Sequence, residues 1–395
     1  MANNLTIWIY DIANPSNYVD VTEYAISLNV TRGKLRDTDL YKPGYASVVF
    51  NNYDRVFDPT NTSSPLYGFL NPKQRIYIDI NAYAVFSGLV DNWSFTYDKT
   101  FEATASFTAY ESTNLFVNQY LPEYTFPSEL SGARINRILD SNWVQWPSGY
   151  GARSIDAGTQ MLDADSIAAN TNVQEYMNLI QQTEQGQLYI DGTETLFFRD
   201  ASRSISSSPG YPVFADDGST YVYSGSTYTS FPYEMIDVSY STELLYNRIN
   251  ANKWDSSSVQ KDDLVSQSLY GLYTLILDGL LSSSSTQLNN LATWLINKYS
   301  IPEYRINSLR VNLFGLSNSR QDDFYSQIKL NGFAKIKFKP NSTGSSIDKY
   351  VRIIGLETEA DSGSHYVTLT FEALKPLLTL DDSEFGKLDY YSLAL

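Results

Sequence analysis

The 395-residue sequence contains no cysteine and a single histidine, His365. Without cysteine there can be no disulfide, no thiolate metal site and no cysteine nucleophile. One histidine removes most histidine-based metal clusters and weakens any case for a Ser/His/Asp triad. We therefore expect no catalytic, cofactor-binding or metal-binding residues, and we interpret His365 as a structural histidine rather than a general base.

Basic residues and long apolar stretches are also scarce. The chain has 28 Lys and Arg against 44 Asp and Glu, a formal net charge of −16. This balance disfavours adhesion to nucleic acid or to an anionic membrane, although acidity also serves solubility alone. The longest apolar run, about 269–281, is interrupted by Asp278 and is shorter than the roughly 20 residues of a membrane span. We expect no membrane span, and residues 1–10 lack the features of a secretory signal.

The standard catalytic motifs are missing as well: there is no phosphate-binding loop, dinucleotide fingerprint, nucleophile elbow or EF-hand loop. Neighbouring carboxylates could suggest a glycosidase, since such enzymes use a pair of acids. With 44 acidic residues, however, near-neighbour pairs arise by chance, and we expect them to lie on a solvated surface. The pairs considered are Asp163 with Asp165, Asp216 with Asp217, and Glu357 with Glu359.

Tyrosine is abundant, with 32 residues, and it is accompanied by much Thr, Ser, Asn and Val. Aromatic and β-branched side chains favour strands. Hydrophobic residues at 43% and charged residues at 18% indicate a folded protein, and the length suits two or three domains. The composition predicts a β-rich α+β fold.

The first segment, residues 1–111, is a series of strands separated by turn residues. Small or apolar side chains alternate with hydroxyl-bearing ones along 103–110, as in a strand with one buried face. A small barrel or sandwich is expected. The predicted strands are Thr6–Tyr10, Ala25–Thr31, Tyr45–Asn51, Arg75–Ile80, Val85–Trp93 and Ala103–Tyr110.

Residues 112–234 have a different pattern, which predicts a small α+β insert. Helical spacing of Ile135, Ile138 and Leu139 after Ser131, a candidate N-cap, indicates a short amphipathic helix. A second helix is predicted over 172–184, with a left-handed stop at Gly186.

Two short strands, 187–190 and 195–199, follow and are joined by a turn at Asp191-Gly192. The Ser-, Gly- and Tyr-rich stretch 202–230 is expected to be a surface loop. Its tyrosines could stack on sugars, but packing at interfaces is the favoured interpretation. The tyrosines in question are Tyr221, Tyr223 and Tyr228.

Residues 235–376 return to strands around one helix, and 377–395 form a C-terminal extension. The helix is predicted by the spacing of Leu288, Leu291 and Leu295 and must end before Pro302. We interpret the extension as a site for docking a partner. The predicted strands are Arg305–Phe314, Ser326–Phe338, Tyr350–Glu359 and Tyr366–Ala373.

A faint internal duplication links the two terminal segments. Gly88-Leu89 precedes a strand that ends at Phe107-Thr-Ala109, and Gly355-Leu356 precedes one that ends at Phe371-Glu-Ala373. Chance could also produce this similarity.

The N-terminal motifs resemble those of siphophage minor tail proteins of the hub type, which are related to the trimeric hubs of contractile-tailed phages. Such proteins open with a strand ending in Thr-Arg-Gly, then a glycine-led strand, an Asn-x-x-Arg-x-Phe-Asp-Pro turn and a Phe-x-Gly strand. The corresponding residues are Thr31-Arg32-Gly33, Gly44 to Phe50, Asn52 to Pro59, and Phe86-Ser-Gly88.

The local chemistry of these motifs is consistent with turns. Gly33 and Gly44 suit turn positions, Asn51 and Asn52 can leave the strand through local side-chain hydrogen bonds, and Pro59 stops pairing. The resemblance continues through 132–135, 155–158, 183–192, 197–200 and 300–309.

This resemblance implies two tail-tube-like β-barrel or sandwich domains, 1–111 and 235–376, with the α+β insert between them. It also implies a non-enzymatic hub of the tail tip (baseplate), a homotrimeric ring that joins the tail tube to the tip complex. Implied partners are the distal tail or tail tube protein, the tape measure protein and tip or fibre proteins. Phage DNA would pass through an acidic channel without specific binding, and the protein would be assembled in the host cytoplasm and reside in the virion.

Two alternatives stay open at this point. One is a host-glycan-binding or glycan-hydrolysing tail protein, and the other is the homologous hub of a contractile injection device.

Overall fold

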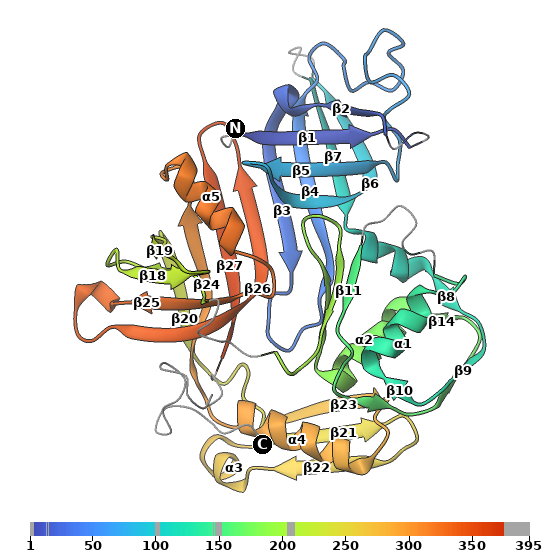
Figure 1. Cartoon of the computed structure of the whole chain (residues 1–395), viewed down its shortest axis with the longest axis vertical. Helices are drawn as coiled ribbons and strands as arrows, with labels where there is room; N and C mark the ends of the chain where they lie inside the picture. Colours follow the sequence, from blue (N-terminus) through green and yellow to red (C-terminus); the bar gives the residue numbers. More distant parts are fainter. Residues whose placement is uncertain are drawn as a thin grey trace.

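A large, almost entirely antiparallel sheet runs through the computed structural model, which describes residues 4–12, 14, 16–98, 103–144, 146, 152–203 and 210–374 (Figure 1). The 13-stranded sheet has the order β2-β1-β5-β6-β7-β4-β3-β26-β27-β24-β20, with β25 branching from β26 and β17 pairing with β25. The β-rich α+β class is confirmed. None of the helices in these ranges is long and apolar enough to cross a membrane.

The first five-strand unit consists of β3 to β7. Its buried side chains alternate along β7, as at Ala105, Phe107 and Ala109, and they belong to the main core. All six strands predicted for this segment are confirmed, although β6 is longer at both ends. The strands are β1 (Leu5–Tyr10), β2 (Tyr18–Asp20), β3 (Ala25–Gly33), β4 (Lys42–Asn51), β5 (Arg75–Ile80), β6 (Tyr83–Tyr97) and β7 (Ala103–Tyr110), with a short 3-10 turn η1 (Thr22–Tyr24).

The second five-strand unit repeats this arrangement. Its spatial order, β25-β26-β27-β24-β20, matches β5-β6-β7-β4-β3 strand for strand in chain order, and all the pairings within both units are antiparallel. The strands are β20 (Met235–Tyr240), β24 (Tyr304–Asn312), β25 (Phe333–Phe338), β26 (Ile347–Ala360) and β27 (His365–Ala373), with η3 (Pro340–Ser342) between β25 and β26.

The register of the last hairpin in each unit also agrees. β6 and β7 have an irregularity between Val90 and Asn92, and β26 and β27 have one between Ile353 and Gly355. When the irregularities are aligned, the partners of equivalent residues are equivalent along the whole hairpin: Thr108 corresponds to Thr370, and Phe107 to Leu369.

The duplication therefore exists as topology, but the sequence motif proposed for it is out of register. Aligning the irregularities makes Gly88 equivalent to Val351 and not to Gly355, because each strand pair fixes its own pairing step by step.

The strand predicted at 326–338 is partly wrong. Ser326 and Gln327 end the helix α5 (Asn318–Gln327), and the strand begins only at Phe333. The connection 313–332 between β24 and β25 stands where the loop 52–74 between β4 and β5 stands in the first unit. Three helices, α3, α4 and α5, occur where one was predicted.

The first insert, residues 112–199, contains the helices α1 (Ser131–Leu139) and α2 (Val173–Glu184), which lie close together (Figure 1). It has its own hydrophobic core. Ser131 is the first helical residue rather than the N-cap, which is Leu130, and the left-handed stop is Gln185 rather than Gly186. The hairpin β15 (Gln187–Ile190) and β16 (Leu196–Arg199) is confirmed. The other elements are η2 (Ser112–Asn118), β8 (Tyr120–Leu121), β9 (Tyr124–Phe126), β10 (Glu129–Leu130), β11 (Arg153–Ile155), β12 (Met161–Leu162), β13 (Asp165–Ile167) and β14 (Thr171–Asn172).

The stretch predicted as a surface loop, 202–230, is only partly one. Phe214 is fully buried, because β17 adds a parallel strand to β25 and inserts this ring into the main core. The strands are β17 (Val213–Ala215), β18 (Thr220–Tyr223) and β19 (Ser226–Thr229).

The second insert, residues 241–303, lies within the connection from β20 to β24. A three-stranded sheet packs against α4 and forms a separate apolar cluster. The helix predicted from Leu288 is confirmed as α4, and Ser284 is its N-cap. The elements are β21 (Arg248–Lys253), β22 (Ser258–Asp262), α3 (Leu264–Tyr270), β23 (Thr274–Leu280) and α4 (Ser285–Tyr299). The domain boundaries expected from the sequence stay predictions, and the C-terminal extension lies outside the described residues from 375 onward.

Candidate functional site

The two five-strand units meet in a strand seam between β3 and β26. Pairing runs from Leu28 opposite Ala360 to Gly33 opposite Gly355. Gly33 has a φ of 98°, and a Cβ atom at this position would lie 2.2 Å from the carbonyl oxygen of Ile354, the residue at the irregularity. The glycine of the Thr-Arg-Gly motif thus permits the close approach of the two units.

Arg32, the preceding residue, forms a buried ion pair with Glu111, with 2.7 Å between Nε and Oε1. Arg32 also donates to the carbonyl of Ile190, which belongs to the first insert. Burial raises the pKa of Glu111, an effect that the neighbouring Arg32 opposes. The motif therefore connects the first unit, the seam and the first insert.

Gly44 lies in β4 and not in a turn, contrary to the prediction. Its amide donates to Oε2 of Glu111 over 2.8 Å, and a Cβ atom would lie 2.9 Å from the Glu111 carboxyl carbon. A glycine is needed here because a side chain at this position would collide with the Glu111 carboxylate.

The Asn-x-x-Arg-x-Phe-Asp-Pro turn is held by local bonds, as predicted for its asparagines. Asn51 accepts from the amide of Tyr53 over 3.0 Å, and the buried Asn52 accepts from that of Phe57 over 2.9 Å. The carboxylate of Asp58 accepts from Thr60, and these hydrogen bonds lower the pKa of Asp58 to about 2.

Two strand edges are open at opposite ends of this double unit. β5 pairs with β6 only as far as Leu89, so the half of β6 from Asn92 to Tyr97 pairs only with β7 among the described residues. β20 pairs only with β24 within the same ranges, and its residues Met235 and Tyr240 are 54% and 68% exposed. Open edges present unpaired amides and carbonyls that can bind another strand.

One face of the sheet carries mostly hydroxyl and amide side chains across both units. This face is opposite the main core, because its residues alternate with the buried ones along each strand. It includes Asn29, Thr31, Ser47, Thr104, Ser106, Thr108, Thr368 and Thr370.

Beside the seam, the charged groups of this open face are Glu357 and Glu359 of β26 and Arg310 of β24, and Lys335 and Lys337 lie on it along β25. Glu357 accepts from Asn29 over 3.3 Å, and Glu359 accepts from Arg310 over 3.3 Å. The guanidinium of Arg310 lies 3.9 Å from the centre of the Tyr366 ring. Glu357 and Glu359 thus both lie on β26 and on its open face.

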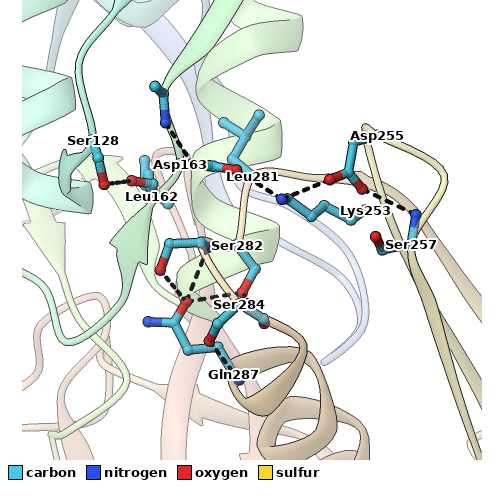
Figure 2. Close-up of polar contacts among 12 residues, drawn as sticks. Ser128, Leu162, Asp163, Lys253, Asp255, Ser257, Leu281, Ser282, Ser284 and Gln287 are labelled. Atoms are coloured by element: carbon cyan, nitrogen blue, oxygen red, sulfur yellow. Dashed lines mark hydrogen bonds and ion pairs between the residues drawn. The ribbon is translucent and has the colours of Figure 1, made fainter.

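The two inserts are held together by a polar contact (Figure 2). The ammonium of Lys253 lies 2.7 Å from a carboxylate oxygen of Asp163 and 2.8 Å from one of Asp255. Beside it, Leu162 of the first insert forms a β-bridge with Ser282 of the second. Gln287 accepts from the hydroxyls of Ser282 and Ser283, and the hydroxyl of Ser284 accepts from the Gln287 amide, which fixes the start of α4.

The motifs that the sequence analysis singled out in the first insert converge on the buried carboxylate of Glu184. It accepts from the Ser131 hydroxyl over 2.8 Å and from Thr159 and the Gln160 amide. A Cβ atom on Gly158 would lie 1.8 Å from the Ser131 hydroxyl. This cluster stabilises the insert.

The other carboxylate pairs are each divided between separate partners. Asp163 binds Lys253, whereas Asp165 accepts from the Tyr176 hydroxyl over 2.9 Å. Asp217 lies 2.6 Å from Lys337, and its neighbour Asp216 accepts from the Tyr233 hydroxyl over 3.2 Å. A cavity of about 530 Å³ lies between the first unit, the first insert and α5, and none of the six carboxylates of these pairs lines it.

His365 is buried in the main core. Its Nε2 atom lies 2.7 Å from the Tyr325 hydroxyl, and burial lowers its pKa to about 4. Tyr221, the most buried of the three tyrosines, donates to Gln327 over 2.6 Å and stacks with Tyr228, and Tyr223 contacts Tyr228 edge-on.

Two features were missed from the sequence. The first is a buried ion cluster in which Lys298 lies 2.7 Å from Glu372 and 3.0 Å from Asp37, residues far apart in the chain with no local motif. The second is an exposed apolar surface on α3 and β23. This surface includes part of the apolar run at about 269–281, which is too short for a membrane span.

Comparison with solved structures finds the same overall fold in tail proteins. A 43 kDa tail protein of prophage MuSo2 from Shewanella oneidensis is 13% identical with a TM-score of 0.61, and the match covers 94% of this chain and 98% of that one. A tail protein from Neisseria meningitidis MC58 is 9% identical with a TM-score of 0.60, covering 94% and 96%. Prophage tail protein gp18 from Listeria monocytogenes is 12% identical with a TM-score of 0.53, covering 92% and 94%.

The chain has the fold of prophage tail proteins. The resemblance predicted from the sequence is thereby confirmed at the level of the fold. No family model and no curated protein matches this sequence.

Proposed function

We propose that this chain is a non-enzymatic structural hub of a phage tail tip, a ring that joins the tail tube to the tip complex and encloses the DNA passage. The two five-strand units would be its tail-tube-like β domains. The observation that carries the proposal is the repeat itself. Two units of the same topology meet edge to edge at the β3–β26 seam, and the counterparts of the two seam strands, β20 and the open half of β6, have no further strand on their outer side among the described residues.

The equivalence of the units specifies how copies would join. Since β20 is equivalent to β3, and the open half of β6 to the paired half of β26, a copy of the internal seam would form between β20 and the neighbour's β6. In that register Ile236 faces Tyr97 and Asp237 faces Thr96. Head-to-tail contacts of this kind form a ring when the rotation between copies closes, and the resemblance of the sequence motifs to those of trimeric tail hubs favours a trimer with six units around the axis.

The open face would form the wall of the passage in such a ring. Its hydroxyl groups carry no charge that binds phosphate, and beside the seam Glu357 and Glu359 give the face a negative sign that Arg310 only partly offsets. A wall of this kind repels DNA without binding it specifically. A tail tube or distal tail protein, a tape measure protein and tip or fibre proteins would be partners, and the location would be the virion tail after assembly in the host cytoplasm.

Cysteine cross-linking tests this proposal directly, because the native chain has no cysteine. We expect Asp237→Cys combined with Thr96→Cys to yield a covalent ladder of dimers and trimers, since facing strand residues lie within disulfide range. The matched control is Asn29→Cys with Glu359→Cys, the equivalent pair inside one chain, which should form an intrachain disulfide.

A second control shifts the register. Asp237→Cys with Asn92→Cys places the thiols about four residues apart along the strand, roughly 13 Å, and should not cross-link. If the in-chain pair forms its disulfide while the Asp237 and Thr96 pair forms none, and electron microscopy shows only monomers, the ring proposal is wrong.

A further inference from the structure

The second insert exposes an apolar surface to solvent. The surface consists of Leu264, Val265 and Leu269 on α3, which are 71%, 71% and 68% exposed, and of Leu272 and Ile276, each 55% exposed. Soluble monomers rarely expose contiguous apolar surface of this kind without a binding role.

The position of α3 is fixed by its polar side chains. Ser266 is buried, its hydroxyl donates to the Ser300 carbonyl over 2.5 Å, and its amide donates to the Asp263 cap over 2.9 Å. Asn247 donates to the Ser266 hydroxyl over 3.1 Å. The polar residue therefore points inward and the leucines outward, the reverse of a helix that packs on its own core.

The internal repeat indicates what lies next to this insert in a ring. The loop between β3 and β4 contacts the second unit beside Glu372, since Asp37 of this loop and Glu372 both bind Lys298. Glu372 is equivalent to Tyr110 in the first unit. The second insert occupies the corresponding β20–β24 connection, so it should reach Tyr110 of the neighbouring copy.

The chain that follows Tyr110 supplies a suitable surface. η2 begins at Ser112, two residues later, and the first insert continues from it. Val117 and Tyr120 in this segment are 44% and 54% exposed, so they offer apolar contact area beside the proposed strand pairing.

We propose that the apolar surface of α3 and β23 docks on the first insert of the adjacent copy, at the segment around Val117 and Tyr120. This inference rests on the proposed ring and adds a second contact to it, continuous with the β20–β6 pairing. The occupant is a second copy of this chain, and the recognition is apolar rather than ionic.

The test uses the full chain with Leu264→Glu and Leu269→Glu together. Both side chains are exposed, so the monomer should keep its melting temperature, while charges placed in an apolar contact should weaken ring assembly at least tenfold by analytical ultracentrifugation. The control is Val222→Glu, which is 59% exposed on the β18–β19 hairpin and should leave assembly unchanged.

A bismaleimide cross-link between Val265→Cys and Val117→Cys supplies the second measurement, and a product joining two copies is expected. If assembly of the glutamate variant is unchanged and this link does not form, while Asp237→Cys and Thr96→Cys still cross-link, the docking is wrong and the ring stands. If neither pair cross-links, the ring itself is wrong.

Discussion

The Nε atom of Arg32 lies 2.7 Å from Oε1 of Glu111, with both side chains almost wholly buried where the two units and the first insert meet. Removing one member should leave an unpaired buried charge. We expect Arg32→Met to lower the free energy of unfolding by about 3–5 kcal/mol. Urea denaturation measures the loss.

The double variant Arg32→Met with Glu111→Leu should be more stable than Arg32→Met alone, because it removes the stranded carboxylate as well. The losses of unfolding free energy in the two single variants then do not sum to the loss in the double variant, as is usual for residues in direct contact. Strictly additive losses in the double-mutant cycle would contradict a coupled pair.

Gly33 should be the most sensitive glycine of the seam. Gly33→Ala must both strain a backbone with a φ of 98° and push a methyl group against the Ile354 carbonyl, 2.2 Å away. We expect a loss above about 2 kcal/mol, more than strain alone costs. Calorimetry or urea unfolding measures it.

Two other glycines separate these causes. Gly68 has a φ of 83° with nothing within 4 Å, and Gly315 has neither a positive φ nor a neighbour. Gly68→Ala should cost about 1 kcal/mol and Gly315→Ala close to none. If Gly33→Ala is no worse than Gly68→Ala, the close approach of the seam is not what requires the glycine.

The strands could be predicted where burial alternates, as in β7, because one face of each strand packs on the core. α5 could not, because only Gln321, Phe324, Tyr325 and Gln327 are buried along it and its surroundings are rich in strand-forming residues. Its structure is decided by packing on β-strands distant in sequence.

The candidate site was predicted only in part. The Thr-Arg-Gly motif marks one side of the seam, but its partner Gly355 is more than 300 residues away, and the pairing depends on the irregularity at Ile354. No single-sequence pattern specifies such a register. The open edges depend on the same register, so they could not be predicted from the sequence either.

Lys298 should hold the second insert against the sheet. Burial would raise the pKa of Asp37, but the ammonium groups of Lys298 and Lys34 lower it well below its usual range. A carboxyl group whose pKa is lowered by folding stabilises the protein at pH values above its unfolded pKa. This stabilisation is lost as the pH falls through the folded pKa. Lys298→Met should therefore destabilise the protein at pH 7 and flatten this pH dependence, because only Lys34 then opposes the effect of burial on Asp37.

Hydrogen exchange of β21 and α4 provides the measurement, because detachment of the insert exposes their amides. Lys339→Met, at an exposed position, is the control and should change nothing. Unaltered exchange in Lys298→Met would mean that the apolar cluster alone holds the insert.

The single histidine makes the last prediction easy to follow. Burial lowers the pKa of His365 to about 4, so the folded protein keeps the ring neutral where the unfolded chain, near 6.5, takes up a proton. The unfolded state then binds more protons between these values, and stability must fall as pH drops from about 6.5 to 4, by up to about 3 kcal/mol. His365→Gln should show a correspondingly flatter dependence in this window, although the carboxylates still contribute below pH 5. Proton NMR of the only imidazole in the chain reports the folded pKa without assignment. A midpoint near 6.5 would show that water reaches the ring and that the Tyr325 contact does not close this part of the core.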